Sequence, residues 1–175
     1  MAVREIVTYP NEVLTTPGET VERIDEEVRE LVEDLIETMY AAPGVGLAAH
    51  QVGVARRVAV VDVTVGEDPS QLLILVNPEL IFEEGKQVDE EGCLSFPGIA
   101  EMVERPMNVT LRALNLEGET FEVDAEGFLA RAFCHEIDHL NGTLFTDRVS
   151  RLKRELIRRK VRKAIRAGEW VEAYR

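Results

Sequence analysis

The sequence predicts an α+β fold, with mainly antiparallel sheets around a central helix and a further helix at the C-terminus. Segments with strand character come in runs and do not alternate one by one with helices, which argues against a parallel sheet. Two alternating segments flank a turn at residues 117–118, as in a β-hairpin. The central helix is expected after them, at residues 127–140. A chain of 175 residues is long enough for one domain with a buried core.

The first helix is expected over residues 25–42, because apolar side chains recur there every three or four positions. They are Val28, Leu31, Val32, Leu35, Ile36 and Met39. Asp25 is a suitable N-cap, and Pro43 and Gly44 would end the helix.

Five segments are expected to form strands: residues 58–63, 72–76, 80–83, 108–116 and 119–123. The first two are rich in β-branched and aliphatic side chains, which is typical of buried strands. The last two alternate between apolar and polar residues, with Glu117 and Gly118 at the turn between them.

Two more helices are expected after the strands. The helix at residues 127–140 should pack through Phe128, Leu129, Ala132 and Phe133. Ser150 would cap a last helix that runs to about Ala167 and ends at Gly168. A narrow apolar stripe along this last helix consists of Leu152, Leu156, Ile157, Val161, Ala164 and Ile165.

Composition indicates a globular protein of a reducing compartment. Hydrophobic residues make up 45% and charged residues 30% of the chain, and no run of about 18 apolar residues predicts a membrane span. The first residues lack the apolar core of a signal peptide. Cys93 and Cys134 are too few for a disulfide scaffold. We therefore expect a cytoplasmic protein without a membrane partner.

The net charge of −13 is distributed unevenly. Residues 148–175 hold 11 Lys and Arg against 3 Asp and Glu, whereas residues 1–147 hold 9 against 30. An acidic body repels a phosphate backbone, so DNA is not an expected partner. The basic C-terminal segment requires a separate explanation.

The segment His135-Glu136-Ile137-Asp138-His139 indicates a metal site, because residues four apart lie one above the other on a helix. Both imidazoles can then bind one ion, and Glu136 can act as general base toward a metal-bound water. The alternative is a surface helix with two unrelated histidines.

A catalytic metal site normally has three protein ligands plus water, so one ligand has to come from elsewhere. No histidine follows His139, and the acidic residues beyond it lie in or near the basic segment. The upstream candidates are Cys93, in a Gly-containing turn between strands, and His50.

Three segments resemble, in order and spacing, the signature motifs of peptide deformylase: GVGLAAHQVG at residues 44–53, EGCLSFPG at 91–98 and HEIDHLNG at 135–142. The resemblance covers essentially the whole chain. It implies that Cys93, His135 and His139 hold the metal, with water as the fourth ligand. It also implies Fe²⁺ as the ion, for which Ni²⁺, Co²⁺ or Zn²⁺ can substitute.

The same resemblance implies an activity, the removal of the N-formyl group from the initiator methionine of nascent polypeptides. Metal-bound hydroxide would attack the formyl carbon with Glu136 as general base and then acid, while Gln51 and the Leu94 N–H stabilise the oxyanion. The bare backbone of Gly46 would let an extended substrate pair beside it. The candidate pocket residues around the formyl-Met side chain are Val45, Phe128 and Ala132.

Other residues near these motifs have two interpretations. Glu91 and Arg105 either form the buried ion pair that steadies the second motif in this family or are each solvated. Cys134 is expected to be a small buried helix residue. His50, beside Gln51, titrates near neutrality and could influence the pH dependence.

The basic segment also has two interpretations. It either docks on the body as a surface helix, or it contacts the ribosome, as similar helices of bacterial deformylases do. Ribosomal RNA would attract such a helix despite the acidic body. We therefore expect a catalytic deformylase domain at residues 1–149 and a basic C-terminal helix at residues 150–175 packed on the same domain.

Two other functions fit part of the sequence. HEIDH alone is compatible with a metallopeptidase that cleaves internal bonds, although the downstream ligand is missing. A non-enzymatic alternative is a structural metal clamp with an RNA-binding helix, but structural zinc usually has four protein ligands.

Overall fold

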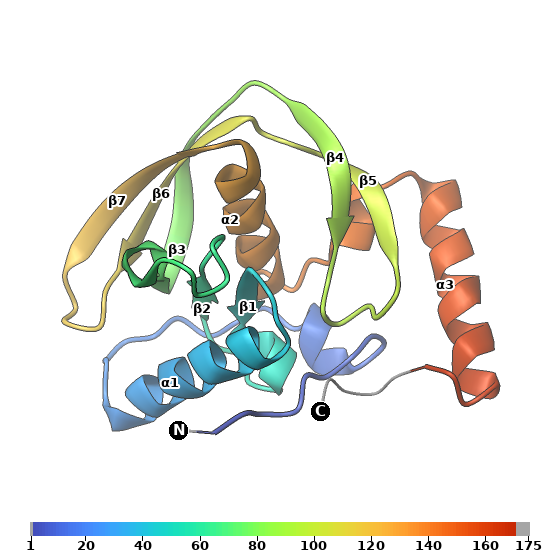
Figure 1. The fold of residues 1–175 in the computed structure, drawn as a ribbon, viewed down its shortest axis with the longest axis horizontal. Helices are drawn as coiled ribbons and strands as arrows, with labels where there is room; N and C mark the ends of the chain where they lie inside the picture. The colour runs from blue at the N-terminus through green and yellow to red at the C-terminus, as the bar shows by residue number, and fades with distance from the viewer. Residues whose placement is uncertain (1, 171–175) are drawn as a thin grey trace.

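The computed structural model describes residues 2–170, within which it has three α-helices and seven strands (Figure 1). The helices are α1 (Glu26–Ala41), α2 (Gly127–Leu140) and α3 (Arg151–Arg166). The strands are β1 (Gly46–Ala48), β2 (Val58–Val61), β3 (Leu73–Glu84), β4 (Gln87–Gly92), β5 (Ala100–Arg105), β6 (Asn108–Leu114) and β7 (Thr120–Glu126). Short 3₁₀ helices are η1 (Glu12–Thr15), η2 (Ala49–Val52), η3 (Pro69–Gln71) and η4 (Phe145–Arg148).

Two antiparallel sheets surround α2. Five strands form one sheet in the order β1-β2-β3-β6-β7, and β4 and β5 pair separately. Figure 1 shows α2 at the centre, between the larger sheet and the β4–β5 pair, with α1 below it and α3 beyond β5. The predicted α+β class, with a central helix and a C-terminal helix, is confirmed.

The three predicted helices form close to their expected bounds, because local signals fix their ends. The Asp25 side chain accepts a hydrogen bond from the Val28 N–H at the start of α1, and Ser150 caps α3 through the Lys153 N–H. Gly168, with a φ of 69°, follows the end of α3. Among the described residues, no helix is both long and apolar enough to cross a bilayer.

The prediction of separate strands at residues 72–76 and 80–83 is wrong, since both belong to the single strand β3. The register of β3 against β6 shifts between Val76 and Glu79, where Asn77 has a φ of 50°. A β-bulge of this kind bends the strand without removing it from the sheet, so one strand looks like two in the sequence.

Side chains also determine where two other strands end. β2 stops at Val61, two residues earlier than predicted, because the Asp62 carboxylate accepts hydrogen bonds from the N–H groups of Thr64 and Gly66. The predicted β6–β7 hairpin is confirmed, and its turn is held by the Asn115 side chain, which accepts from the Glu117 N–H.

Three strands are not indicated by the sequence pattern. β1 has only three residues, and β4 reads QVDEEG, in which charged residues replace the expected apolar ones. β5 pairs with β4 over six residue pairs from Gln87–Arg105 to Gly92–Ala100. This pair of strands flanks α2 (Figure 1), and Cys93, the residue that follows β4, lies next to His139 of α2.

The core consists of three main apolar clusters. One lies between α1 and β1–β2, the second between α2 and the larger sheet, and the third joins α3 to η1, η4 and the loop after β4. The predicted stripe on α3 is only partly correct, because Ile157 and Val161 are buried whereas Leu152, Leu156 and Ile165 are exposed. The face of α3 that packs against the rest of the protein is therefore narrower than the apolar stripe predicted from the sequence.

The packing of α2 also differs from the prediction at one position. Ala132 and Phe133 are buried as expected, and Leu129 packs partly buried against the same cluster. Phe128 is 56% exposed, so it is not part of the core. It lies in the first turn of α2, directly after the end of strand β7.

Candidate metal centre

The structure brings together Cys93, His135 and His139, whose ligand atoms all lie within 4.8 Å of one another. The two histidines are one turn apart on α2, with 3.2 Å between their Nε2 atoms. Cys93 follows β4 directly, and its Sγ lies 3.3 Å from the Nε2 of His139. Among residues 2–170, this is the one group of three or more His, Cys, Asp or Glu placed to share an ion.

These separations fit a tetrahedral metal ion. Metal–nitrogen distances of about 2.05 Å and metal–sulfur distances of about 2.3 Å give tetrahedral edges of about 3.3 Å (N–N) and about 3.6 Å (N–S). The observed distances of 3.2 and 3.3 Å are close to these edges. Three donors leave one corner of the tetrahedron for water or substrate, which is the arrangement of a catalytic site.

Glu91 fixes the orientation of His135. Its Oε2 lies 2.8 Å from the Nδ1 of His135, and a carboxylate can only accept this bond, so Nδ1 carries a proton and Nε2 is the nitrogen that faces the candidate metal site. Arg105 holds the same carboxylate through bonds of 2.6 and 3.0 Å. Both side chains are buried, which confirms the expected ion pair.

The ion pair belongs to a larger buried network that the sequence did not indicate. Arg131 donates to Glu91 Oε1 at 3.0 Å, and Arg105 also donates to Asp138 at 2.6 Å. Arg148, which is exposed, adds two bonds to Asp138 from the surface, the shorter of 2.7 Å. The available signal was the presence of two further charged residues, Arg131 and Asp138, besides Glu136 on a helix that is mostly apolar.

Burial and neighbouring charges determine the protonation of this cluster. Burial opposes the ionised form of Glu91, but hydrogen bonds and charges of His135 and Arg105 outweigh it and hold the pKa of Glu91 well below its usual range. Burial also disfavours a charged His135, yet Cys93 and Glu91 raise the pKa of His135 well above 6.5. Burial and the nearby His135 lower the pKa of His139 well below 6.5, which favours the neutral imidazole that binds metals.

Glu136 lies between the two histidines in sequence and is almost fully buried. Burial raises the pKa of Glu136 to about 7, and its Oε1 has no hydrogen-bond partner among the described residues. The other oxygen lies against the backbone of β1, so closely that a Cβ atom on Gly46 would be 2.5 Å from it. A carboxyl group in this position can exchange a proton near neutral pH.

Gln51 and Leu94 approach the site from two other segments. Gln51 is in η2, where its Oε1 accepts a bond from the Ala48 N–H. This contact turns its Nε2 toward Cys93 Sγ at 3.7 Å and toward Ser95 Oγ at 3.3 Å. Leu94 follows Cys93 in the chain, so its backbone N–H is also close to the Cys93 side chain.

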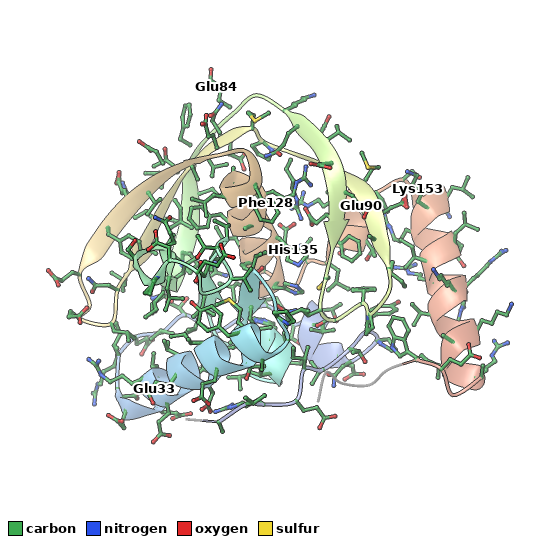
Figure 2. All side chains as sticks on the ribbon, in the orientation of Figure 1. Glu33, Glu84, Glu90, Phe128, His135 and Lys153 are labelled. Carbon is green, nitrogen blue, oxygen red and sulfur yellow. The ribbon has the colours of Figure 1, made fainter. Side chains whose placement is uncertain are left out.

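A cavity of about 290 Å³ lies beside the cluster. The proposed substrate-binding residues all line it, together with the two candidate oxyanion donors: Val45, Gly46, Phe128, Ala132, Gln51 and Leu94. Cys93, His135 and Glu136 also line the cavity. Figure 2 labels Phe128 and His135 along α2 and Glu90, another lining residue, on the neighbouring strand β4.

The strand β1 forms the free edge of the larger sheet next to this cavity. The Asp62 N–H donates to the Val45 C=O at 2.8 Å, and bonded and non-bonded residue pairs alternate along antiparallel strands. The N–H and C=O of Gly46 therefore point away from β2, toward the free edge. An extended peptide could pair with them.

His50 and Cys134 do not join the cluster. His50 is fully buried, and its Nε2 lies 2.8 Å from the backbone oxygen of Thr16. Burial lowers the pKa of His50. Cys134 is a buried free thiol, as expected, and burial raises its pKa to about 11.

Comparisons by sequence find a family and close relatives for this chain. A family model described as polypeptide deformylase matches residues 3–155. The peptide deformylase of Acidobacterium capsulatum is 54% identical over 170 residues, which cover 97% of this chain and all of the relative.

Solved structures give the same result. A peptide deformylase from Legionella pneumophila is 44% identical, with a TM-score of 0.88 over 95% of this chain and 98% of that one. The Ehrlichia chaffeensis peptide deformylase, solved in complex with actinonin, is 39% identical, with a TM-score of 0.85 over 93% of this chain and 98% of that one. This chain therefore belongs to the polypeptide deformylase family and is a hydrolase.

Proposed function

We propose that this protein removes the N-formyl group from the initiator methionine of nascent polypeptides in the cytoplasm, with a divalent metal held by Cys93, His135 and His139. The observation that carries the proposal is the convergence of these three donors beside Glu136 and a cavity that ends at a free strand edge. One thiolate and two imidazoles suit Fe²⁺, which we propose as the native ion, and also Ni²⁺, Co²⁺ and Zn²⁺.

The bound ion would act as a Lewis acid on the formyl oxygen and on a water molecule. Glu136 would take a proton from the attacking water and deliver it to the leaving nitrogen, because its pKa near 7 permits both steps at neutral pH. The C–N bond of the formamide breaks, the water oxygen ends in formate, and the methionine is left with a free amine.

Gln51 and the Leu94 N–H would stabilise the negative charge that develops on the formyl oxygen. The amide of Gln51 is already oriented by Ala48, so its Nε2 is held beside Cys93 without reorganisation during the reaction. Removal of one such donor typically costs about 2.7–4 kcal/mol of transition-state stabilisation.

The substrate backbone would pair with Gly46 at the edge of β1, which aligns the formyl group with Glu136. The methionine side chain would enter the cavity past Val45 and Ala132, and the exposed ring of Phe128 would cover it. Such a division, in which the backbone supplies pairing and a pocket supplies specificity, is typical of β-strand addition.

A formate-release assay tests this function with the anaerobically purified, metal-analysed protein. We expect hydrolysis of formyl-Met-Ala-Ser and no hydrolysis of acetyl-Met-Ala-Ser or of casein. Glu136→Gln should keep the metal content and lower kcat by a factor of about 10²–10⁴. Full activity of Glu136→Gln, or cleavage of casein, would contradict the proposed mechanism.

We also propose that residues 150–175, of which 171–175 lie outside the described residues, contact the ribosome as a basic segment that follows a catalytic domain at residues 1–149. Most Lys and Arg side chains of α3 are exposed, so they are free to meet RNA phosphates. Leu152 and Leu156 are exposed on the same helix and could add apolar contact.

Cosedimentation with ribosomes over a salt series tests this contact. The double variant Lys160→Glu/Lys163→Glu should weaken binding and reduce the salt slope by about one for each RNA phosphate that the variant no longer neutralises. Lys86→Glu is the matched control, because Lys86 is exposed at the turn between β3 and β4. Equal binding by the double variant, the control and the unmodified protein would refute the proposal.

A further inference from the structure

Ser95 joins the two segments that carry the proposed oxyanion donors. It follows Leu94 directly and is fully buried. Its hydroxyl donates to the Val7 backbone oxygen at 2.8 Å, and its own backbone oxygen accepts from the Tyr9 N–H at 2.9 Å. The Val7 N–H in turn donates to the Gln51 backbone oxygen at 2.8 Å. The N-terminal segment around Val7 is therefore hydrogen-bonded to both donor segments.

The direction of these hydrogen bonds fixes the side-chain amide of Gln51. A carbonyl oxygen can only accept, so the Ser95 hydroxyl uses its proton on Val7 and can only accept from Gln51. The Gln51 Nε2 lies 3.3 Å from this hydroxyl oxygen, while the Ala48 N–H donates to the Gln51 Oε1 at 3.0 Å. An amide turned the other way would lose both hydrogen bonds, because it would place oxygen against oxygen and donor against donor. Ser95 and Ala48 together therefore select one orientation.

The selected orientation directs an amide donor toward the candidate metal site. The Gln51 Nε2 carries two protons, and Ser95 accepts one of them. The same nitrogen lies 3.7 Å from Cys93 Sγ, so its second proton is available for a formyl oxygen bound beside Cys93. In the reversed orientation the Gln51 oxygen would face this place and would repel the negative charge that develops there.

We propose that Ser95 is a positioning residue for deformylation, which holds the Gln51 amide with an N–H toward the formyl oxygen. This inference rests on the deformylase function and on the donor role of Gln51 proposed above. Ser95 does not line the cavity, and its hydroxyl both donates and accepts within the protein. The effect of Ser95 on the reaction therefore passes through Gln51.

Steady-state kinetics of Ser95→Ala on formyl-Met-Ala-Ser, with metal content measured on each sample, give the first test. The variant leaves one amide proton of Gln51 without its acceptor, so we expect kcat to fall about tenfold, the effect of one hydrogen bond. KM should stay within about twofold, because Gln51 acts on charge that exists only in the transition state. A raised KM with unchanged kcat, or a loss of activity that follows loss of metal, would overturn the inference.

A double-mutant cycle shows whether Ser95 acts through Gln51. Gln51→Leu should lower kcat by a factor of about 10²–10³, since it removes the donor. Ser95→Ala added to Gln51→Leu should lower kcat by less than about twofold further, because no amide is left to position. The same tenfold loss in both backgrounds would show that Ser95 supports the site in another way and would overturn the inference.

Thr38→Val is the matched control for a weakened N-terminal segment. Thr38 is a buried residue of α1 whose Oγ1 accepts from the Arg4 N–H at 2.8 Å, and among the described residues it has no hydrogen bond to Gln51. The variant removes a comparable hydrogen bond from the same segment, and kcat should stay within about twofold of the unmodified protein. A tenfold loss of kcat in Thr38→Val would overturn the inference, because any anchor of this segment would then have the same effect.

Nuclear magnetic resonance of the zinc-loaded, unmodified protein answers the same question if Ser95→Ala does not fold. A side-chain amide proton of Gln51 should show an NOE to the β protons of Ser95, since the two side chains bond at 3.3 Å, and its absence would overturn the inference. Full activity of Gln51→Leu would overturn the donor role of Gln51 and this inference with it. No formate release by the unmodified protein would instead overturn the deformylase function itself.

Discussion

A methyl group added at Gly46 would collide with the carboxyl group of Glu136. The Cβ atom of an alanine at this position would lie 2.5 Å from Glu136 Oε2 and 2.9 Å from its Cδ, whereas ordinary contacts begin at 3.4 Å. The carboxyl group would have to move by about 0.9 Å to restore an ordinary contact. Misplacement of a catalytic group by about 1 Å can cost about 10²-fold in rate, which corresponds to about 2.7 kcal/mol. Gly46→Ala should therefore lower kcat/KM about a hundredfold.

Formate release from formyl-Met-Ala-Ser, with metal content measured on the same sample, tests this reasoning. Metal content should be unchanged, because Gly46 lies against Glu136 and not against the three proposed ligands. Gly92→Ala is the matched control: Gly92 lines the same cavity, but its added Cβ would meet nothing nearer than 3.6 Å, so the loss should be much smaller. Activity of Gly46→Ala within threefold of the unmodified protein, or a loss that follows loss of metal, would refute the argument.

Two further substitutions test the buried charges. Glu91→Gln removes the carboxylate that orients His135, so metal affinity should fall by a factor of about 10–100 in a competition titration with a chelator; unchanged affinity would contradict the orienting role. Tyr40→Phe removes a 2.6 Å bond to the buried Asp62 and should lower the free energy of unfolding at pH 7 by about 1.5–3 kcal/mol. Burial tends to raise the pKa of Asp62, but hydrogen bonds from Tyr40, Thr64 and Gly66 hold this pKa below 3.8. The ionised Asp62 therefore stabilises the folded protein at pH values above the unfolded pKa, and this contribution is lost as the pH falls through the folded pKa. The loss of unfolding free energy caused by Tyr40→Phe, measured by urea unfolding, should thus be smaller at pH 3 than at pH 7. An equal loss at both pH values would show that Asp62 ionisation is not involved.

The helices could be predicted because their signals are local. Asp25 and Ser150 cap α1 and α3 through bonds to residues three positions later, so a short stretch of sequence contains the whole interaction. The β6–β7 hairpin is local in the same way, with Asn115 closing its own turn. These elements do not depend on which distant segment packs against them.

The strands β4 and β5 could not be predicted from the pattern, because their inward side chains are charged. Glu91 and Arg105 occupy positions that an apolar residue would fill in an ordinary strand, and their burial depends on each other and on α2. For α3 the pattern predicted too much burial, since only Ile157 and Val161 of the predicted apolar stripe are buried against the rest of the protein. Both differences arise from contacts between segments far apart in the sequence.

The candidate metal site also combines a local feature that the sequence predicts with a long-range contact that it does not. The spacing of His135 and His139 on a helix is local geometry and could be derived from the sequence. The choice of Cys93 over His50 could not, because residue chemistry left both open and only the resemblance to a family favoured Cys93. The structure places Cys93 Sγ 3.3 Å from His139, whereas His50 bonds the backbone at Thr16.

The position of Glu91 links folding of the β4–β5 pair to assembly of the metal centre. Glu91 lies in β4, two residues before Cys93, so one short segment carries both the proposed sulfur ligand and the carboxylate that bonds to His135. An isolated buried carboxylate would be strongly destabilising, and it is tolerated here because Arg105 from β5 and Arg131 from α2 both donate to it. The carboxylate therefore reaches its place only when all three elements are packed together. Metal affinity should consequently report the docking of β4 and β5 on α2, because the same contacts that neutralise Glu91 aim the imidazole of His135 at the ion.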